Sequence, residues 1–170
     1  MKSFSFNDLG GLWFMNLTAL EMAVFAPFLI QGLAMIFDEF YFHHKRGLPR
    51  WERIGHPLDT ITVLSCFVFV LVADPSETNL WIYGGLCAFS CLFVTKDEPV
   101  HSQLCGWAES WLHSVLFVLH PLSFFAAGLI WALERFENLK PLLLGQGLSV
   151  TVFLIYQIGY WNIYAKKHAH

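Results

Sequence analysis

Histidines and carboxylates recur in this chain as pairs whose spacing matches a helical turn. Three pairs are four residues apart and one is three apart: Glu39 and His43, Asp97 and His101, Glu109 and His113, and His56 and Asp59. Both spacings place two side chains on one helix face, with their Cβ atoms about 5–6 Å apart. A neutral imidazole and a carboxylate so placed can bind one metal ion, or the carboxylate can orient the imidazole that binds it. The pattern therefore predicts metal chemistry.

Four pairs offer more ligands than one tetrahedral ion needs. Two ions bridged by carboxylates would use them, as in helical di-iron sites where Glu and His side chains project inward from facing helices. A single pair of this kind is more often a surface interaction, and helix ends at a membrane also favour polar residues for solvation alone. The hypothesis of a shared site therefore requires that the fold bring the four pairs together.

The composition is that of a membrane protein. Of the 170 residues, 56% are hydrophobic and 14% are charged, whereas soluble domains carry about 25% charged residues. The length suits a single domain, residues 1–170, and a net charge of −3 without a basic stripe indicates no nucleic-acid partner. The four cysteines lie in or beside apolar runs, which favours buried thiols over a disulfide framework.

About 20 mostly apolar residues cross a bilayer, and five segments are candidates. They are residues 12–37, 58–73, 80–95, 107–133 and 142–165. The sequence thus predicts an all-α integral membrane bundle of about five transmembrane helices, in which the fifth helix closes the bundle. Seven Lys and Arg residues fall on one side of it and three on the other. The positive-inside rule therefore places the N-terminus outside and the C-terminus in the cytoplasm, and we expect a bacterial inner (plasma) membrane.

This topology brings the ends of four consecutive spans, and all four pairs, to the cytoplasmic face. Asp38 lies at the same helix end as Glu39 and His43. The candidate metal ligands are Glu39, His43, His56, Asp59, Asp97, His101, Glu109 and His113, with His44 and His120 in reserve. Asp59 and Glu109 are also the candidate catalytic carboxylates.

Three further polar residues have two interpretations each. His120 lies near the middle of the fourth span, where an ionisable group is costly, so it is either an inner ligand or proton relay or a histidine hydrogen-bonded to a neighbouring helix. Glu21, inside the first span, is expected to pair with another buried polar group or to remain protonated. Arg46 either follows the positive-inside rule or holds a lipid phosphate at the mouth of the site.

In plan, residues 38–120 resemble the membrane desaturases and hydroxylases, whose histidines gather at the cytoplasmic face. Those enzymes carry HxxxH and HxxHH boxes, whereas this chain has only "HH" at His43–His44 and isolated histidines, with carboxylates in the gaps. The resemblance implies two iron ions, oxidation of a lipid chain and an electron-donor protein as partner. Mixed His and carboxylate ligands suit iron in such roles.

A zinc-dependent hydrolase of a lipid ester or amide is the second possibility. Zinc takes three protein ligands and a water, which a carboxylate can activate as general base. His56, His101 and His113 would bind the zinc, with Asp59 or Glu109 as the base, in a plan that resembles the alkaline-ceramidase-like membrane hydrolases. A non-enzymatic metal-binding or sensing membrane protein is the third possibility.

Overall fold

The described part of the chain is built from helices. The structure is a computed structural model that describes residues 17–165, and no strand occurs among them. Its elements are α1 (Ala19–Phe37), a π-helical turn (Asp38–His43), α2 (His44–Arg46), α3 (Arg50–Val72), α4 (Glu77–Phe93), a 3-10 turn (Val94–Asp97), α5 (Glu98–Leu104), α6 (Trp107–Ala132), a second 3-10 turn (Glu134–Leu139), α7 (Lys140–Tyr156) and a second π-helical turn (Gln157–Tyr164). The predicted all-α class is confirmed.

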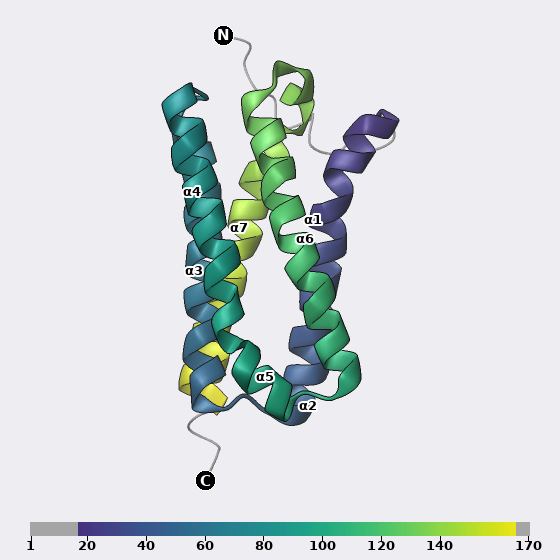
Figure 1. The fold of residues 1–170 in the computed structure, drawn as a ribbon, viewed down its shortest axis with the longest axis vertical. Coiled ribbons are helices and arrows are strands. Elements are labelled where there is room, and N and C mark those ends of the chain that lie inside the picture. Colours follow the sequence, from purple (N-terminus) through teal and green to yellow (C-terminus); the bar gives the residue numbers. More distant parts are fainter. Residues whose placement is uncertain (1–16, 166–170) are drawn as a thin grey trace.

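These elements join into five long helical segments that run along the long axis of the molecule (Figure 1). They are Ala19–Arg46, Arg50–Val72, Glu77–Leu104, Trp107–Ala132 and Glu134–Tyr164, and each is long and apolar enough to cross a membrane. The 23 residues of α3 extend about 35 Å at 1.5 Å per residue, against a hydrocarbon core about 30 Å thick. The number of candidate spans agrees with the prediction.

A capping box starts α1. The Thr18 hydroxyl accepts a hydrogen bond from the backbone N–H of Glu21 at 3.2 Å, and the Glu21 carboxylate accepts one from the backbone N–H of Thr18 at 2.8 Å. This reciprocal arrangement satisfies donors that a helix start leaves unpaired. Glu21 therefore caps its own helix, and Asn138 and Arg135 of the later 3-10 turn also interact with its carboxylate. The predicted start of this span, at residue 12, lies outside the described residues.

The second helix begins eight residues earlier than predicted, at Arg50. Gly47 takes a φ of 77° and a ψ of 158°, a region open essentially to glycine, and Pro49 is the N-cap of α3. This tight turn lets the chain resume a helix at once, so the polar segment that carries Glu52 and His56 is helical. A count of apolar residues detects only the part of a helix that would lie in hydrocarbon, which is why the prediction is too short.

The bundle has an apolar end and a polar end. α1 packs along α6, and α3 contacts both α4 and α7. The apolar core lies toward the N-terminal half of α1 and the C-terminal halves of α3 and α6, where Phe28, Phe67, Phe124, Ile130 and Trp131 are buried. At the opposite end, where α2 and α5 lie (Figure 1), the buried side chains include most of the buried His, Asp and Glu residues.

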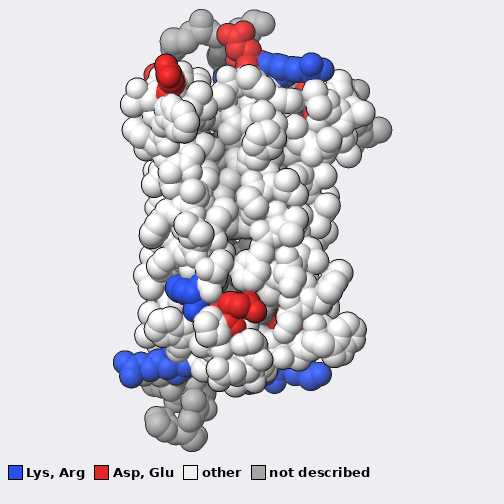
Figure 2. All heavy atoms as spheres, in the orientation of Figure 1, with Lys and Arg blue, Asp and Glu red and all other residues white. Residues whose placement is uncertain are grey.

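The outer surface between these ends is apolar. On the face shown in Figure 2, charged side chains lie toward the two ends and a broad uncharged belt separates them. Large apolar side chains are exposed on every long helix, for example Leu33, Val68, Leu92, Val118 and Val152. Contiguous apolar surface of this extent is rare on soluble monomers and marks contact with a membrane or a partner.

Candidate metal centre

Buried ionisable residues from four helical segments meet at the polar end of the bundle. The π-helical turn after α1 supplies three, α3 one, the α4–α5 segment two and α6 two: Asp38, Glu39 and His43; Glu52; Asp97 and His101; Glu109 and His113. Each is 8% exposed or less. Because buried charges require a partner or a metal, a cluster of this density needs a specific explanation.

Four of the histidines form a closed ring of imidazoles. The ring centroids are 4.8 Å apart between His43 and His56, 6.1 Å between His56 and His101, 4.3 Å between His101 and His113, and 6.4 Å between His113 and His43. One histidine comes from each of the four segments, so the ring exists only in the folded bundle. The structure thus brings together the histidine of every predicted pair.

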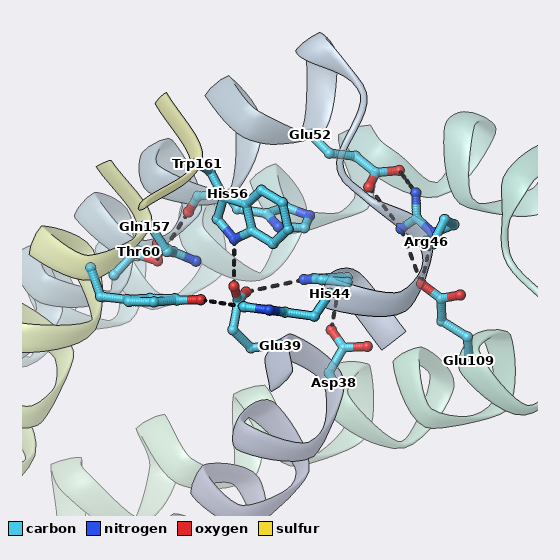
Figure 3. A network of polar contacts seen from close by, with 12 residues as sticks. Asp38, Glu39, His44, Arg46, Glu52, His56, Thr60, Glu109, Gln157 and Trp161 are labelled. Atoms are coloured by element: carbon cyan, nitrogen blue, oxygen red, sulfur yellow. Dashed lines mark hydrogen bonds and ion pairs between the residues drawn. The ribbon is translucent and has the colours of Figure 1, made fainter. Parts of the chain in front are cut away.

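Carboxylates lie between these imidazoles. Asp38 reaches two of them, with Oδ2 at 3.2 Å from Nε2 of His43 and Oδ1 at 3.2 Å from Nε2 of His113. The Oε2 atom of Glu39 lies 3.1 Å from Nδ1 of His43, as the i, i+4 spacing predicted. The other Glu39 oxygen accepts a short hydrogen bond from the Trp161 indole (Figure 3). Glu39 therefore joins the imidazole ring to the last helix.

Several imidazole nitrogens in this cluster have no hydrogen-bond partner among the described residues. They are both ring nitrogens of His101, Nδ1 of His113 and Nε2 of His43, and the last lies 3.2 Å from Oδ2 of Asp38 without forming a hydrogen bond. A buried polar atom left unpaired costs about 1–3 kcal/mol. Metal coordination is the interaction that unpaired imidazole nitrogens beside carboxylates are suited to make.

The potential ligand atoms fall into four groups, in each of which all the atoms lie within 4.8 Å of one another. The groups are Asp38, His43, Glu109 and His113; Glu52, His56 and His101; Glu39, His43 and His56; and His101, Cys105 and His113. The first two groups share no residue. The arrangement therefore has the donors for two adjacent metal ions.

Arg46 connects the two separate groups. Its guanidinium donates to both oxygens of Glu52, at 2.8 and 3.3 Å, and to Oε1 of Glu109, at 3.0 and 3.2 Å (Figure 3). Side chains of Glu52 and Glu109 are 0% and 5% exposed. Arg46 is thus an internal counter-ion, a role that the sequence analysis did not include; its positions under the positive-inside rule and beside a lipid phosphate stay predictions.

Glu52 is a candidate ligand that the sequence prediction missed. It precedes His56 by four residues, the same spacing as in the other three pairs. Its Oε1 atom lies 3.7 Å from Nε2 of His101. The spacing is visible in the sequence, but the predicted span begins at residue 58 and so leaves Glu52 outside the helix. When Glu52 is included, each of the four segments carries a carboxylate followed four residues later by a histidine.

Asp97, one of the eight buried residues, lies with Asp59 to one side of the imidazole ring. The Lys96 ammonium is 2.7 Å from both oxygens of Asp59 and 2.9 Å from Oδ2 of Asp97. A Cβ at Gly55 would stand 3.0 Å from Oδ1 of Asp97, so the glycine allows this close approach. Among the described residues, neither aspartate belongs to a group with metal-binding distances. Their predicted roles as ligands, and that of Asp59 as a catalytic base, stay predictions.

The two reserve histidines lie outside the imidazole ring. Nε2 of His44 is 2.8 Å from the Tyr156 hydroxyl, and the His44 ring stacks on Tyr160 with centroids 4.7 Å apart. His44 and Trp161 show that the last helix contributes polar contacts near the site, although it was predicted only to close the bundle.

His120 lies deeper in the bundle, and both of its nitrogens have partners. Nδ1 is 3.2 Å from the Gln31 amide and Nε2 is 3.2 Å from the Ser90 hydroxyl, which in turn lies 2.8 Å from the Thr62 hydroxyl. These residues come from α1, α4 and α3. This geometry favours the interpretation of a histidine hydrogen-bonded to neighbouring helices over that of an inner ligand.

Cys105, in the turn between α5 and α6, was predicted to be only a buried thiol. It belongs to one of the four donor groups, with His101 and His113. Burial, with the Glu109 carboxylate nearby, raises the pKa of the Cys105 thiol to about 12. The thiol is therefore protonated at neutral pH in the absence of a metal.

Comparison of the chain with protein-family models, with curated proteins and with solved structures found no match. The case for a function therefore depends on the geometry of this cluster and its position in the bundle.

Proposed function

We propose that the protein is an integral membrane metalloprotein with a dinuclear centre at the cytoplasmic face, and that it is a di-iron oxidoreductase acting on a lipid chain. One observation carries the proposal. Four imidazoles from four helical segments form a ring, three of them buried and that of His56 half-buried, and several of their nitrogens lack a hydrogen-bond partner among the described residues. A cluster built only to join helices would satisfy those atoms.

Charge balance supports two divalent ions. The four carboxylates Asp38, Glu39, Glu52 and Glu109 carry four negative charges, and Arg46 returns one positive charge, which leaves three negative charges if the imidazoles are neutral. Buried carboxylates without compensating cations are strongly destabilising. Two divalent ions bring four positive charges and nearly neutralise the cluster.

The donor types favour iron. Nitrogen and carboxylate oxygen in similar numbers suit iron, whereas structural zinc sites use mainly thiolate and imidazole. Soluble di-iron bundles project Glu and a Glu–His pair inward from facing helices. Here the pair spacing is i, i+4 on each of four segments, so the similarity lies in the donor set and in its origin from several helices.

The position of the cluster supports the lipid substrate and the orientation. The uncharged belt seen in Figure 2 fits insertion in a bilayer, and the cluster lies at one end of that belt. Lys45, Arg50 and Arg53 lie at the same end, which the positive-inside rule assigns to the cytoplasm. We therefore place the centre at the cytoplasmic face of a bacterial inner membrane, where an electron-donor protein can reach it.

A zinc-dependent lipid hydrolase is the second candidate, because of one specific observation. His101, Cys105 and His113 form a nitrogen and sulfur donor group within 4.8 Å, and catalytic zinc sites include mixed sets of thiolate and imidazole ligands. Glu109 lies close to this group and would be the general base.

The test is the metal content of tag-free protein purified in detergent without added metal, measured by mass spectrometry. About two irons per chain are expected for the wild type, and His101→Ala, His113→Ala and Glu52→Gln should each lose most of the metal. The matched control is His44→Gln, because His44 lies on the neighbouring turn but contacts Tyr156. Mössbauer spectroscopy would then establish whether the two irons are coupled.

Each other result has a definite meaning. One or two zinc ions per chain, lost on Cys105→Ser, would replace the iron proposal with the hydrolase. No metal after reconstitution with iron or zinc would overturn both. Equal metal content in the wild type and in all the site variants would show that the metal is bound elsewhere.

A further inference from the structure

An apolar groove runs along the outer surface between the end of α1 and the start of α6. Its volume is about 570 Å³. One wall consists of Phe37, Tyr41 and Phe42, and the other of Trp107, Ala108, Trp111 and Leu112. The lining contains no charged side chain, so it offers nothing to a phosphate or to a charged peptide.

The groove is lined by the sequence neighbours of candidate metal ligands on two segments. Phe37 and Phe42 directly precede Asp38 and His43 in the sequence, and Leu112 directly precedes His113. Asp38 and His113 contact each other across these two segments at 3.2 Å. The apolar wall is thus one residue away from candidate ligands on both sides of the groove.

We propose that this groove holds the hydrocarbon chain of a membrane phospholipid and directs the methylenes nearest the head group toward the Asp38–His113 contact. The proposal rests on the proposed function and adds the substrate class and the part of the chain that reacts. A phospholipid chain fits because the groove opens on a surface whose exposed side chains are apolar. Its aromatic walls also suit the level of the lipid head groups.

Depth determines which part of the chain is presented. Trp107 is the first residue of α6 and is 86% exposed, which is typical of a tryptophan at the membrane interface. His113 follows six residues later, which corresponds to about 9 Å along the helix. The interfacial layer that holds Trp107 is about 5–7 Å thick outside a hydrocarbon core of about 30 Å, so this point lies a few ångströms inside the core, at the level of the first methylenes. The terminal methyl of a long chain lies much deeper.

A second groove provides a matched control. It has a volume of about 380 Å³ and an apolar lining between α3 and α4 that includes Ile61, Val68 and Leu86. It lacks a neighbouring ring of candidate ligands, since none of its lining residues is adjacent in sequence to one of the four histidines. Filling this second groove therefore tests whether labelling of the first groove depends on its own shape or only on general contact with lipid.

The experiment uses the full chain in nanodiscs that contain phospholipid with a photoreactive diazirine, either on a carbon near the head group or near the methyl end. Crosslinked peptides are identified by mass spectrometry. The probe near the head group should label the segments 37–43 and 107–113 preferentially, and Ala108→Trp should abolish most of that labelling by filling the groove. Val68→Trp, in the control groove, should leave it unchanged.

Leu112→Trp is a second filling variant in case Ala108→Trp does not fold, which thermal unfolding would reveal. Three results would overturn the proposal that the groove holds a lipid chain. They are equal labelling of both grooves, labelling mainly by the probe near the methyl end, and labelling that neither filling variant changes. Metal content is measured on the same samples, so the two proposals fail separately. Labelling as expected without metal would retain the groove and remove the di-iron centre, and bound iron without specific labelling would do the reverse.

Discussion

Removal of the internal counter-ion, by Arg46→Gln, is the sharpest perturbation of the candidate site. Arg46 donates four hydrogen bonds to Glu52 and Glu109, and both carboxylates are almost fully buried. Breaking a buried ion pair by removing one partner costs about 3–5 kcal/mol, because the remaining charge stays buried without compensation. For a chain of this size, 1 kcal/mol corresponds to about 2–4 °C. The metal-free variant should therefore unfold about 6–20 °C below the wild type.

The metal-loaded Arg46→Gln variant should lose much less stability than the metal-free variant. Metal ions would neutralise Glu52 and Glu109 in place of the guanidinium, and removal of that competitor should also raise the metal affinity. The assay is thermal unfolding in detergent, followed by tryptophan fluorescence, with chelator and with bound metal. Arg50→Gln is the control, since Arg50 is exposed at the same end of the bundle, and it should change stability by less than about 0.5 kcal/mol.

Two results would refute this reasoning. A loss below about 1 kcal/mol in the metal-free Arg46→Gln protein would mean that the pair is solvated like a surface pair. An equal loss with and without metal would mean that Glu52 and Glu109 keep their arginine in the loaded protein and do not bind the ion.

Two further predictions separate structural roles from metal binding. His120→Leu should lower the free energy of unfolding by about 1–3 kcal/mol, because the buried Ser90 hydroxyl and the half-buried Gln31 amide each lose a partner, while metal content stays unchanged. Denaturant unfolding with metal analysis checks both, and loss of metal would restore His120 as a ligand. Gly47→Ser should cost about 1–3 kcal/mol, because its φ of 77° is strained for any side chain. Gly106→Ser, at the N-cap of α6 with a φ of −71°, should be neutral or stabilising in the same thermal assay, and equal effects at the two glycines would contradict the backbone explanation.

Local features of the sequence were sufficient for the helical class, the number of candidate spans and most of the histidine cluster. The length of an apolar run and the i, i+4 spacing of a pair are both properties of one helix, so they can be read without knowledge of its neighbours. Glu39 and His43 contact each other as their spacing predicted. The four histidines meet because consecutive spans alternate in direction, which brings every second connection to the same end.

Only the tertiary structure decided which carboxylates face an imidazole and which face a cation. Asp59 binds Lys96, 37 residues away, and Glu109 binds Arg46, 63 residues away. Glu39 accepts a hydrogen bond from the indole of Trp161, which lies 122 residues later in the sequence. Each of these pairings depends on how far apart two helices stand and how each is rotated about its axis. Packing of apolar side chains elsewhere in the bundle sets these distances and rotations. They cannot be read from the spacing of polar residues along one helix.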